Sequence, residues 1–88
     1  MKLVFTHTAE KQFKKLSIDV QNYCRSKIKA YRSQKDLFEQ NLKPVQHIEP
    51  ATHRLRVGRY RFLLECDTSA RLYRVLKVAH RKNVYKPK

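Results

Sequence analysis

The chain has 88 residues, which is enough for one small domain with a two-layer core and too few for a deep enclosed pocket. Lysine and arginine total 21 against 7 acidic residues, so the formal charge is +14. Such an excess favours polyanionic partners, nucleic acid above all. No segment approaches the ~20 apolar residues of a membrane span, and the apolar run at residues 3–5 is too short for a signal peptide. We therefore expect a single domain, residues 1–88, that is cytoplasmic and has no membrane partner.

The cysteines and histidines show no metal-binding pattern. Cys24 and Cys66 fall within predicted regular elements and form neither a CxxC motif nor a Cys/His pair at ligand spacing. No two histidines have the i, i+4 spacing of a metal site on a helix; they are His7, His47, His53 and His80. We predict two buried, reduced thiols, no metal and no cofactor.

The first third of the chain predicts a strand and two helices. Residues 2–6 contain Leu-Val-Phe and predict a short strand. Thr8 is the expected N-cap of a first helix, with Glu10 in its first turn. Ser17 is the expected cap of a second helix, whose apolar stripe consists of Val20, Cys24, Ile28 and Tyr31. The short connection between the helices predicts an antiparallel helical hairpin.

Residues 33–52 have no clear periodicity. Pro44 and Pro50 interrupt the segment, and the apolar residues at 37, 38 and 42 either extend the second helix or pack a loop. Long irregular segments of compact domains are often functional. Lys43, His47 and Glu49 are therefore functional candidates.

A β-hairpin is predicted from residue 54 to residue 63. The only glycine, Gly58, separates two runs in which basic and apolar residues alternate, which predicts a two-residue turn at positions 58 and 59. The register then places Val57 opposite Tyr60, Arg56 opposite Arg61, Leu55 opposite Phe62 and Arg54 opposite Leu63. One face of the hairpin is apolar and the other carries three arginines.

The pairing of Arg56 with Arg61 points to an anionic ligand. Like charges directly opposite each other destabilise a sheet, so folding alone gives no reason for this pairing. The alternative is that the arginines are solvated and protect a sheet edge. We favour an anion-binding face.

Residues 72–79 are rich in β-formers and predict a central strand after a turn at residues 65–70. The predicted order is β-α-α-β-β-β. It describes an α+β domain in which a two-helix hairpin packs on one face of a mainly antiparallel four-stranded sheet. We expect the other face to be open and basic.

Three stretches of the chain resemble motifs of the RelE/ParE superfamily, the toxin halves of type II toxin–antitoxin pairs. The stretch from His53 to Arg61 (HRLRVGRYR) is similar to the family hairpin YRLRVGxYR. Residues 78–85 (VAHRKNVY) resemble its terminal motif, and residues 6–16 match TxxAxKxFxKL. The resemblance covers nearly the whole chain and implies the same fold.

The resemblance also implies a function. RelE-like members cleave mRNA in the ribosomal A site, whereas ParE-like members inhibit DNA gyrase without nuclease chemistry. The hairpin arginines together with Arg81 and Tyr85 resemble the RelE-like set. This implies a toxin that inhibits translation by ribosome-dependent, metal-free endonucleolytic cleavage of mRNA. The alternatives are a ParE-like gyrase inhibitor and a non-enzymatic RNA-binding module.

Metal-free RNA cleavage requires deprotonation of the 2′-hydroxyl, stabilisation of the phosphorane and protonation of the leaving 5′-oxygen. Arginine forks suit the phosphorane, and an aromatic side chain can stack on a base. Arginine is a poor acid or base, and relatives carry lysines where this chain has Arg54 and Arg56. Histidine is the residue type most often used for proton transfer, so His80 is the candidate. The predicted catalytic set is Arg56, Arg61, His80, Arg81 and Tyr85, and the predicted RNA-binding set is Lys43, Arg54, Arg59 and Lys82.

Partners follow from the same resemblance. We expect a cognate antitoxin, an acidic and partly disordered chain that folds on binding. The ribosome and mRNA are the expected targets, and the toxin–antitoxin complex is expected to bind operator DNA.

Overall fold

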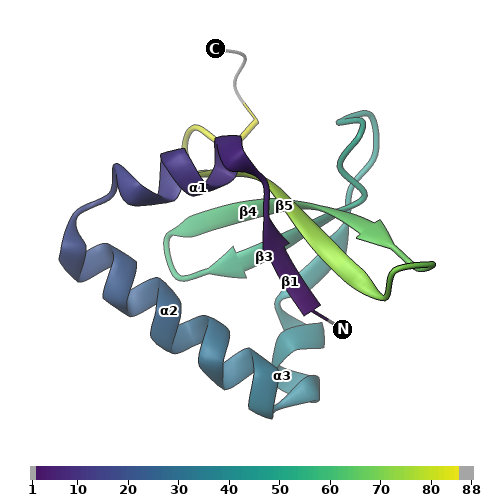
Figure 1. Cartoon of the computed structure of the whole chain (residues 1–88), viewed down its shortest axis with the longest axis horizontal. Helices are drawn as coiled ribbons and strands as arrows, with labels where there is room; N and C mark the ends of the chain where they lie inside the picture. The colour runs from purple at the N-terminus through teal and green to yellow at the C-terminus, as the bar shows by residue number, and fades with distance from the viewer. Residues whose placement is uncertain (1, 86–88) are drawn as a thin grey trace.

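The computed structural model describes residues 2–85 (Figure 1). Within that range the elements are β1 (Lys2–Phe5), α1 (His7–Lys14), α2 (Ile18–Ser33), α3 (Lys35–Gln40), β2 (Leu42–Pro44), β3 (His53–Val57), β4 (Tyr60–Asp67) and β5 (Leu72–His80). The strands form one sheet in the order β1-β5-β4-β3-β2, in which β1 runs parallel to β5 and the other neighbours are antiparallel. The predicted α+β class with a mainly antiparallel sheet is confirmed. The described residues hold five strands and three helices, one more of each than predicted.

The segment after α2 contains both extra elements. Gln34 has extended backbone angles, φ −130° and ψ 94°, so α2 ends there and α3 begins as a separate helix. β2 then pairs with the start of β3, which places Lys43 opposite Arg54. An edge strand of three residues is too short to show an alternating pattern, so periodicity does not predict it.

Thr6, rather than the predicted Thr8, caps α1. Its hydroxyl accepts a hydrogen bond from the backbone nitrogen of Ala9 (3.2 Å) and donates one to the backbone oxygen of Val75 (3.0 Å). The cap therefore also ties the end of β1 to β5, which Thr8 inside the helix cannot do. Ser17 caps α2 as predicted and accepts from the backbone nitrogen of Val20 (3.2 Å).

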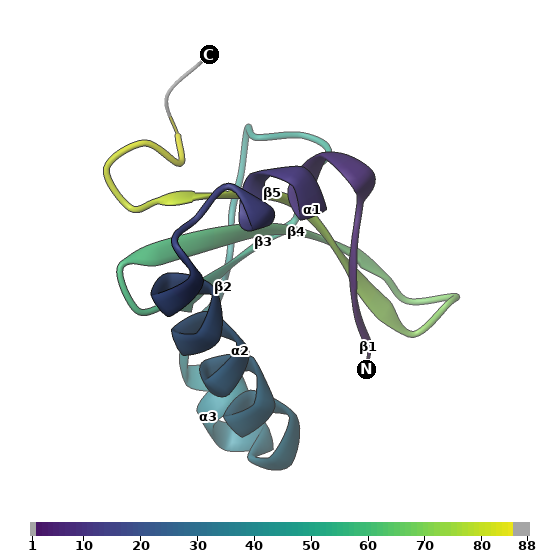
Figure 2. The same ribbon diagram turned by 60° about the vertical axis from the view of Figure 1, so that its left-hand side comes forward.

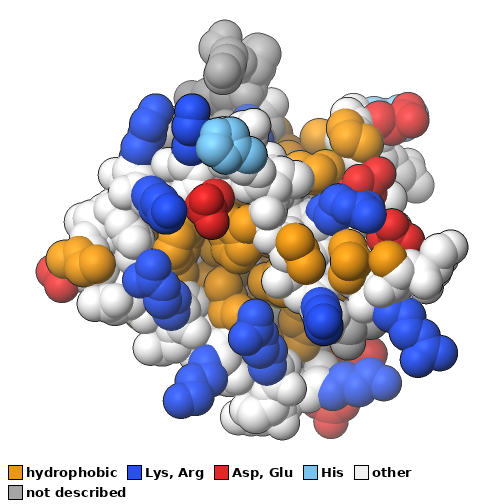
Figure 3. All heavy atoms as spheres, viewed as in Figure 1, with side chains coloured by type: hydrophobic (Ala, Val, Ile, Leu, Met, Phe, Trp, Pro, Cys, Tyr) orange, Lys and Arg blue, Asp and Glu red, His pale blue; other side chains and the backbone are white. Residues whose placement is uncertain are grey.

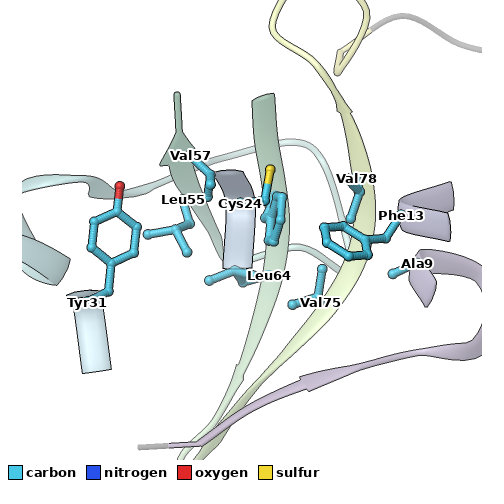
Figure 4. Close-up of a cluster of buried hydrophobic side chains, with 10 residues drawn as sticks. Ala9, Phe13, Cys24, Tyr31, Leu55, Val57, Leu64, Val75 and Val78 are labelled. Atoms are coloured by element: carbon cyan, nitrogen blue, oxygen red, sulfur yellow. The ribbon is translucent and has the colours of Figure 1, made fainter. Parts of the chain in front are cut away.

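The main core lies between the helices and one face of the sheet (Figure 4). Three phenylalanines from β1, α1 and β4 contact one another edge to face, with ring centroids 5.6, 5.7 and 6.5 Å apart: Phe5, Phe13 and Phe62. Cys24 is fully buried here as predicted, and burial raises the pKa of its thiol. Cys66 is only half-buried. In Figures 1 and 2, α1 crosses β5 while α2 and α3 lie together beside β3.

The opposite face of the sheet is only partly open, contrary to the prediction. The loop at residues 45–52 and the turn at residues 81–85 fold over part of it and form a second apolar cluster. Its buried members are Ala51, Leu63 and Val84, packed against Val45, Ile48, Leu76 and Ala79. The uncovered part, which we call the arginine face, carries the side chains of Arg54, Arg56 and Arg61.

β5 contains one bulge. Leu63 pairs with Lys77 whereas Leu64 pairs with Val75, so Leu76 is an extra residue on β5. The bulge allows Val75 and Val78, three positions apart, both to face the helices. No helix in the described part of the chain is long and apolar enough to cross a membrane.

Candidate functional site

The β3–β4 hairpin has the predicted register at every pair from Arg54–Leu63 to Val57–Tyr60. Gly58 has φ 63°, and Arg59 is not among the residues with positive φ, as in a type II′ turn with glycine at the first central position. A Cβ atom at Gly58 would lie 2.4 Å from Cε2 of Tyr23 on α2. The left-handed backbone conformation therefore favours glycine, and any side chain at this position would also have to displace the exposed ring of Tyr23.

The arginine face gathers positive charge around Arg61. Leu55, Val57 and Phe62 are buried against the helices, so the alternating arginines point to the other side. Burial lowers the pKa of the Arg61 guanidinium, and the nearby charges of Arg54, Arg56 and Arg81 lower it further, whereas Tyr85 raises it. The four arginines and the Tyr85 phenol therefore lie close enough to interact electrostatically. We call these four arginines the arginine cluster.

Hydrogen bonds fix two of the guanidiniums. Nη1 of Arg61 donates to the backbone oxygens of Gly58 and Tyr60, both at 2.9 Å, and so holds the side chain over the turn. Nε of Arg56 donates to Oδ1 of Asn41 at 3.1 Å. The backbone of Arg56 is fixed too: its nitrogen donates to the oxygen of Asn41 (2.8 Å), and its oxygen accepts from the Tyr31 hydroxyl (2.6 Å).

Asn41 and Tyr31 are thus positioning residues that sequence analysis did not assign to the site. Tyr31 had been assigned to the apolar stripe of α2, and it is buried there. A buried tyrosine hydroxyl needs a hydrogen-bond partner, and this requirement is the signal from which a positioning role for Tyr31 could have been inferred. Asn41 follows α3, an element the sequence pattern did not show, so no signal identified it.

The turn after β5 contributes Arg81 and Tyr85 to the site. The backbone nitrogen of Arg81 donates to the backbone oxygen of Arg59 (2.8 Å), which joins the end of β5 to the hairpin turn. Nζ of Lys77 donates to the backbone oxygen of Val84 (2.9 Å) and holds the turn against the sheet. Tyr85 follows directly, and its side chain is 55% exposed. Arg81 and Tyr85 therefore come beside the hairpin arginines, as the sequence analysis expected.

His80 lies on the other side of the sheet. It pairs with Tyr60, and the two rings contact at 5.4 Å between centroids. Tyr60 packs against the helix-side core, whereas Ala79, not His80, lies opposite Arg61. Nδ1 of His80 accepts from the backbone nitrogen of Lys82 (3.2 Å). The structure does not bring the predicted acid or base to the arginine cluster, because successive strand residues face opposite sides.

The predicted RNA-binding residues surround the arginine cluster. Lys43 lies opposite Arg54, so it extends the arginine face to the edge strand. Arg59 and Lys82 are exposed beside the hairpin turn and after β5. Ion pairs within residues 2–85 join Lys14 to Glu10 and Arg74 to Glu65 and Asp67, and none involves the arginine cluster. Within the same range no group of three or more His, Cys, Asp or Glu side chains could hold a metal ion.

Solved structures of RelE toxins share this architecture. The RelBE2 toxin–antitoxin complex from Mycobacterium tuberculosis matches with a TM-score of 0.66 at 24% identity, over 91% of this chain and 96% of that chain. The RelB–RelE complex from Methanococcus jannaschii matches at 0.66 and 22%, over 97% and 98%. The RelE–RelB complex from Pyrococcus horikoshii matches at 0.67 and 13%, over 94% and 97%.

The chain has the RelE toxin fold. The predicted resemblance is thereby confirmed at the level of the fold. By sequence, neither a protein-family model nor a curated protein matches the chain.

Two hollows accompany this RelE-like fold. One, of about 570 Å³, lies on the helix side between α2, α3 and the sheet, and its floor is apolar (Figure 3). The charged residues that line it are three basic ones and one acidic one: Lys2, Arg32, Lys35 and Glu39. The other, of about 410 Å³, lies on the opposite side between the 45–52 loop and the 81–85 turn, and Tyr85 forms part of its wall. The first lies on the other face of the sheet from the arginine cluster, whereas the second shares Tyr85 with the surroundings of the cluster.

Proposed function

We propose that this chain is the toxin of a type II toxin–antitoxin pair and that it cleaves mRNA on the ribosome. The observation that carries the proposal is the arginine cluster itself. Guanidiniums from β3, β4 and the turn after β5 converge without an ion pair to any carboxylate in the described part of the chain. Mutual repulsion disfavours this arrangement in the free protein, and a bound phosphate would relieve it.

The proposed roles follow from the hydrogen bonds. Because Nη1 of Arg61 is occupied by the turn carbonyls, its Nε–Nη2 edge is the one that can face a phosphate. Arg56, held by Asn41, supplies the second fork, and Arg81 the third contact. Tyr85 stacks on a neighbouring base, which holds the RNA in an extended, unstacked conformation. Lys43, Arg54, Arg59 and Lys82 bind flanking phosphates.

This chain's contribution to the reaction is then to orient the RNA and to stabilise the charge of the phosphorane. His80 faces the helices, so it makes no contact with this phosphate in the proposal. Arginines that remain protonated do not exchange protons readily, and cleavage of free RNA is expected to be slow or absent. The ribosome, in this proposal, supplies the substrate geometry.

The proposal includes an acidic antitoxin as partner. The three matching structures described above each contain a RelB antitoxin with the toxin. The helix-side groove of this chain has an apolar floor and basic residues at its rim, which suits an amphipathic acidic segment (Figure 3). Binding there would neutralise part of the net charge of +14.

The test is cleavage of mRNA on translating ribosomes by the wild-type chain and by Arg81→Ala. We expect A-site cuts from the wild type and a loss of about 100-fold in rate from Arg81→Ala, the typical effect of removing one donor to a developing oxyanion. Arg32→Ala on α2 is the matched control, because it removes an equal charge from the helix side. If the wild type leaves ribosome-bound mRNA intact, the nuclease proposal is wrong.

A binding function without cleavage is the second candidate, and the position of His80 favours it. With His80 on the helix side of the sheet, the same surface can act by binding alone, as a ParE-like gyrase inhibitor or an RNA-binding module would. Inhibition of DNA supercoiling by gyrase, without cleavage of mRNA, would support the gyrase-inhibitor alternative. Salt-sensitive RNA binding without 2′,3′-cyclic phosphate ends would support the RNA-binding module.

A further inference from the structure

The hollow beside the arginine cluster has the features of a base-binding pocket. Its floor is the second apolar cluster, with Leu63 from β4, Leu76 from the bulge of β5 and Val84 from the final turn. Its volume of about 410 Å³ falls within the ~300–1,000 Å³ of small-ligand sites. Apolar walls of this kind suit an aromatic ring system.

Polar groups surround this floor. Glu49 from the 45–52 loop and Lys77 from β5 both line the pocket, and the ammonium group of Lys77 donates a hydrogen bond to the Val84 backbone oxygen. The exposed ring of Tyr85 forms another part of the wall. An acceptor and a donor over an apolar floor match the edge of a nucleobase, which presents amino groups and ring or carbonyl acceptors.

The pocket is one nucleotide's reach from the arginine cluster. On the arginine face, Leu63 is the next residue after Arg61 along β4, about 7 Å further at the rise of a strand. Tyr85 belongs to both parts, since it lines the pocket and interacts with the charge of Arg61. A phosphate held by Arg61 would therefore leave the attached base at the mouth of the pocket.

We propose that this pocket, bounded by the 45–52 loop and the 81–85 turn, receives the nucleobase next to the phosphate at Arg61, and that Glu49 and Lys77 determine which base it prefers. The inference rests on the proposed function, in that it takes the anion at the arginine cluster to be an RNA phosphate. It adds a base-selecting site built from the 45–52 loop. Neither Glu49 nor Lys77 contributes to phosphate binding in this scheme.

The test is binding of nucleotides to the full chain without ribosomes. We would titrate isotope-labelled protein with each of the four nucleoside 3′-monophosphates and with base-free ribose 5-phosphate, and follow the amide signals by NMR. We expect the nucleotides to bind more tightly than the sugar phosphate and to shift the signals of Leu63, Leu76 and Val84. Equal binding of all five probes, or shifts confined to the hairpin turn, would overturn the proposal and leave the pocket to another ligand, such as a side chain of a protein partner.

Three variants separate the contributions. Ile48→Trp, on the rim of the pocket, should reduce nucleotide binding to the level of ribose 5-phosphate and leave the sugar phosphate unaffected. Tyr85→Ala should weaken all four nucleotides by about 5- to 100-fold, the range of one stacking contact. Glu49→Gln should change the order of the four affinities, with a change of about tenfold for the preferred base. Glu39→Gln on α3 is the matched control.

This assay separates the two proposals. A chain that never cuts mRNA can still show base-dependent binding, whereas a chain that cuts mRNA can lack it. If Glu49→Gln weakens the four nucleotides equally, or not at all, the assignment of base preference to Glu49 is wrong, whatever the outcome of the ribosome experiment.

Discussion

The β4–β5 ribbon carries arginines at both ends, and the charge of these arginines is balanced differently at each end. We call the end next to the 68–71 connection the far end and the end next to the β3–β4 turn the near end. At the far end, Arg74 donates to Asp67 at 2.7 Å and pairs with Glu65 at 3.7 Å. The hydrogen bond that Arg74 donates to Asp67 raises the pKa of the Arg74 guanidinium. At the near end, burial and three other arginines lower the pKa of Arg61. The far end has carboxylate partners, whereas within residues 2–85 no carboxylate forms an ion pair with the arginines of the near end.

This difference distinguishes charges that stabilise the fold from charges that can bind a ligand. The net charge alone does not make this distinction, because it is a sum over the whole chain. An arginine with its own carboxylates has little reason to attract a ligand. A group of arginines without them is electrostatically unfavourable until an anion arrives, which is the usual condition of a binding site. The comparison predicts that substitutions at the two ends have different, and in part opposite, effects.

The largest expected effect is that of Gly58→Ala, which breaks the near end. The substitution forces a residue with a side chain into φ 63° and drives its Cβ into the ring of Tyr23. We expect a loss of about 1–3 kcal/mol in the free energy of unfolding, measured by urea denaturation.

The double variant Tyr23→Ala/Gly58→Ala removes the clash and keeps the backbone strain. It should recover part of the loss relative to Tyr23→Ala alone. Full recovery would show that the left-handed backbone at position 58 costs nothing, against our account of the turn.

The next prediction compares the contributions of the two ends to RNA binding. Arg56→Gln at the near end should reduce the slope of log K against log salt for single-stranded RNA by about 0.7, since one phosphate contact is lost. Arg74→Gln removes the same charge at the far end and should leave the slope unchanged, because that guanidinium is engaged by Asp67. Filter binding over a series of salt concentrations measures both. Equal reductions would mean that the chain binds RNA by its overall charge.

A smaller effect concerns stability without ligand. Arg54→Gln removes one positive charge beside Arg61 and should raise the free energy of unfolding by about 0.5 kcal/mol at low salt. Arg74→Gln should lower the melting temperature, because two carboxylates lose their partner. The two substitutions should therefore shift the melting temperature in opposite directions, which thermal denaturation in dilute buffer measures. Two changes of the same sign would contradict it.

The smallest effect is a dependence on pH at the far end. The backbone N–H of Ala70, followed by the guanidinium of Arg74, lowers the pKa of Asp67 below its ordinary value of 3.8. A lowered carboxyl pKa stabilises the fold fully above pH 3.8, and this contribution is lost as the pH falls through the lowered pKa. The difference in melting temperature between wild type and Asp67→Asn should therefore be present near neutral pH and shrink below pH 3.8.

The hairpin could be predicted from the sequence because its determinants are local. One glycine and two alternating runs determine both the turn and the register from Arg54 to Leu63. The same parity places the three hairpin arginines on one face. The alternating pattern thus predicted the part of the site that two adjacent strands build.

The rest depends on tertiary contacts. Local sequence does not distinguish Thr6 from Thr8 as the cap of α1. The choice is made by the second hydrogen bond of the Thr6 hydroxyl, to Val75, which is distant in the sequence. The position of His80 depends on the register between β4 and β5, which the bulge at Leu76 shifts. A strand's own pattern does not reveal that shift, and an error of one residue moves a side chain to the other face. Asn41 escaped notice because α3 and β2 are short.

The extra residue at Leu76 also divides the ribbon mechanically. A bulge bends a strand and interrupts its ladder of hydrogen bonds, so the pairs from Tyr60–His80 to Leu63–Lys77 form one block and those from Leu64–Val75 to Asp67–Leu72 another. Lengthening the exposed connection at residues 68–71 would strain the outer block first and reach the inner block only weakly. That connection is accordingly the place where a label or an affinity tag can be inserted while the guanidinium geometry stays intact.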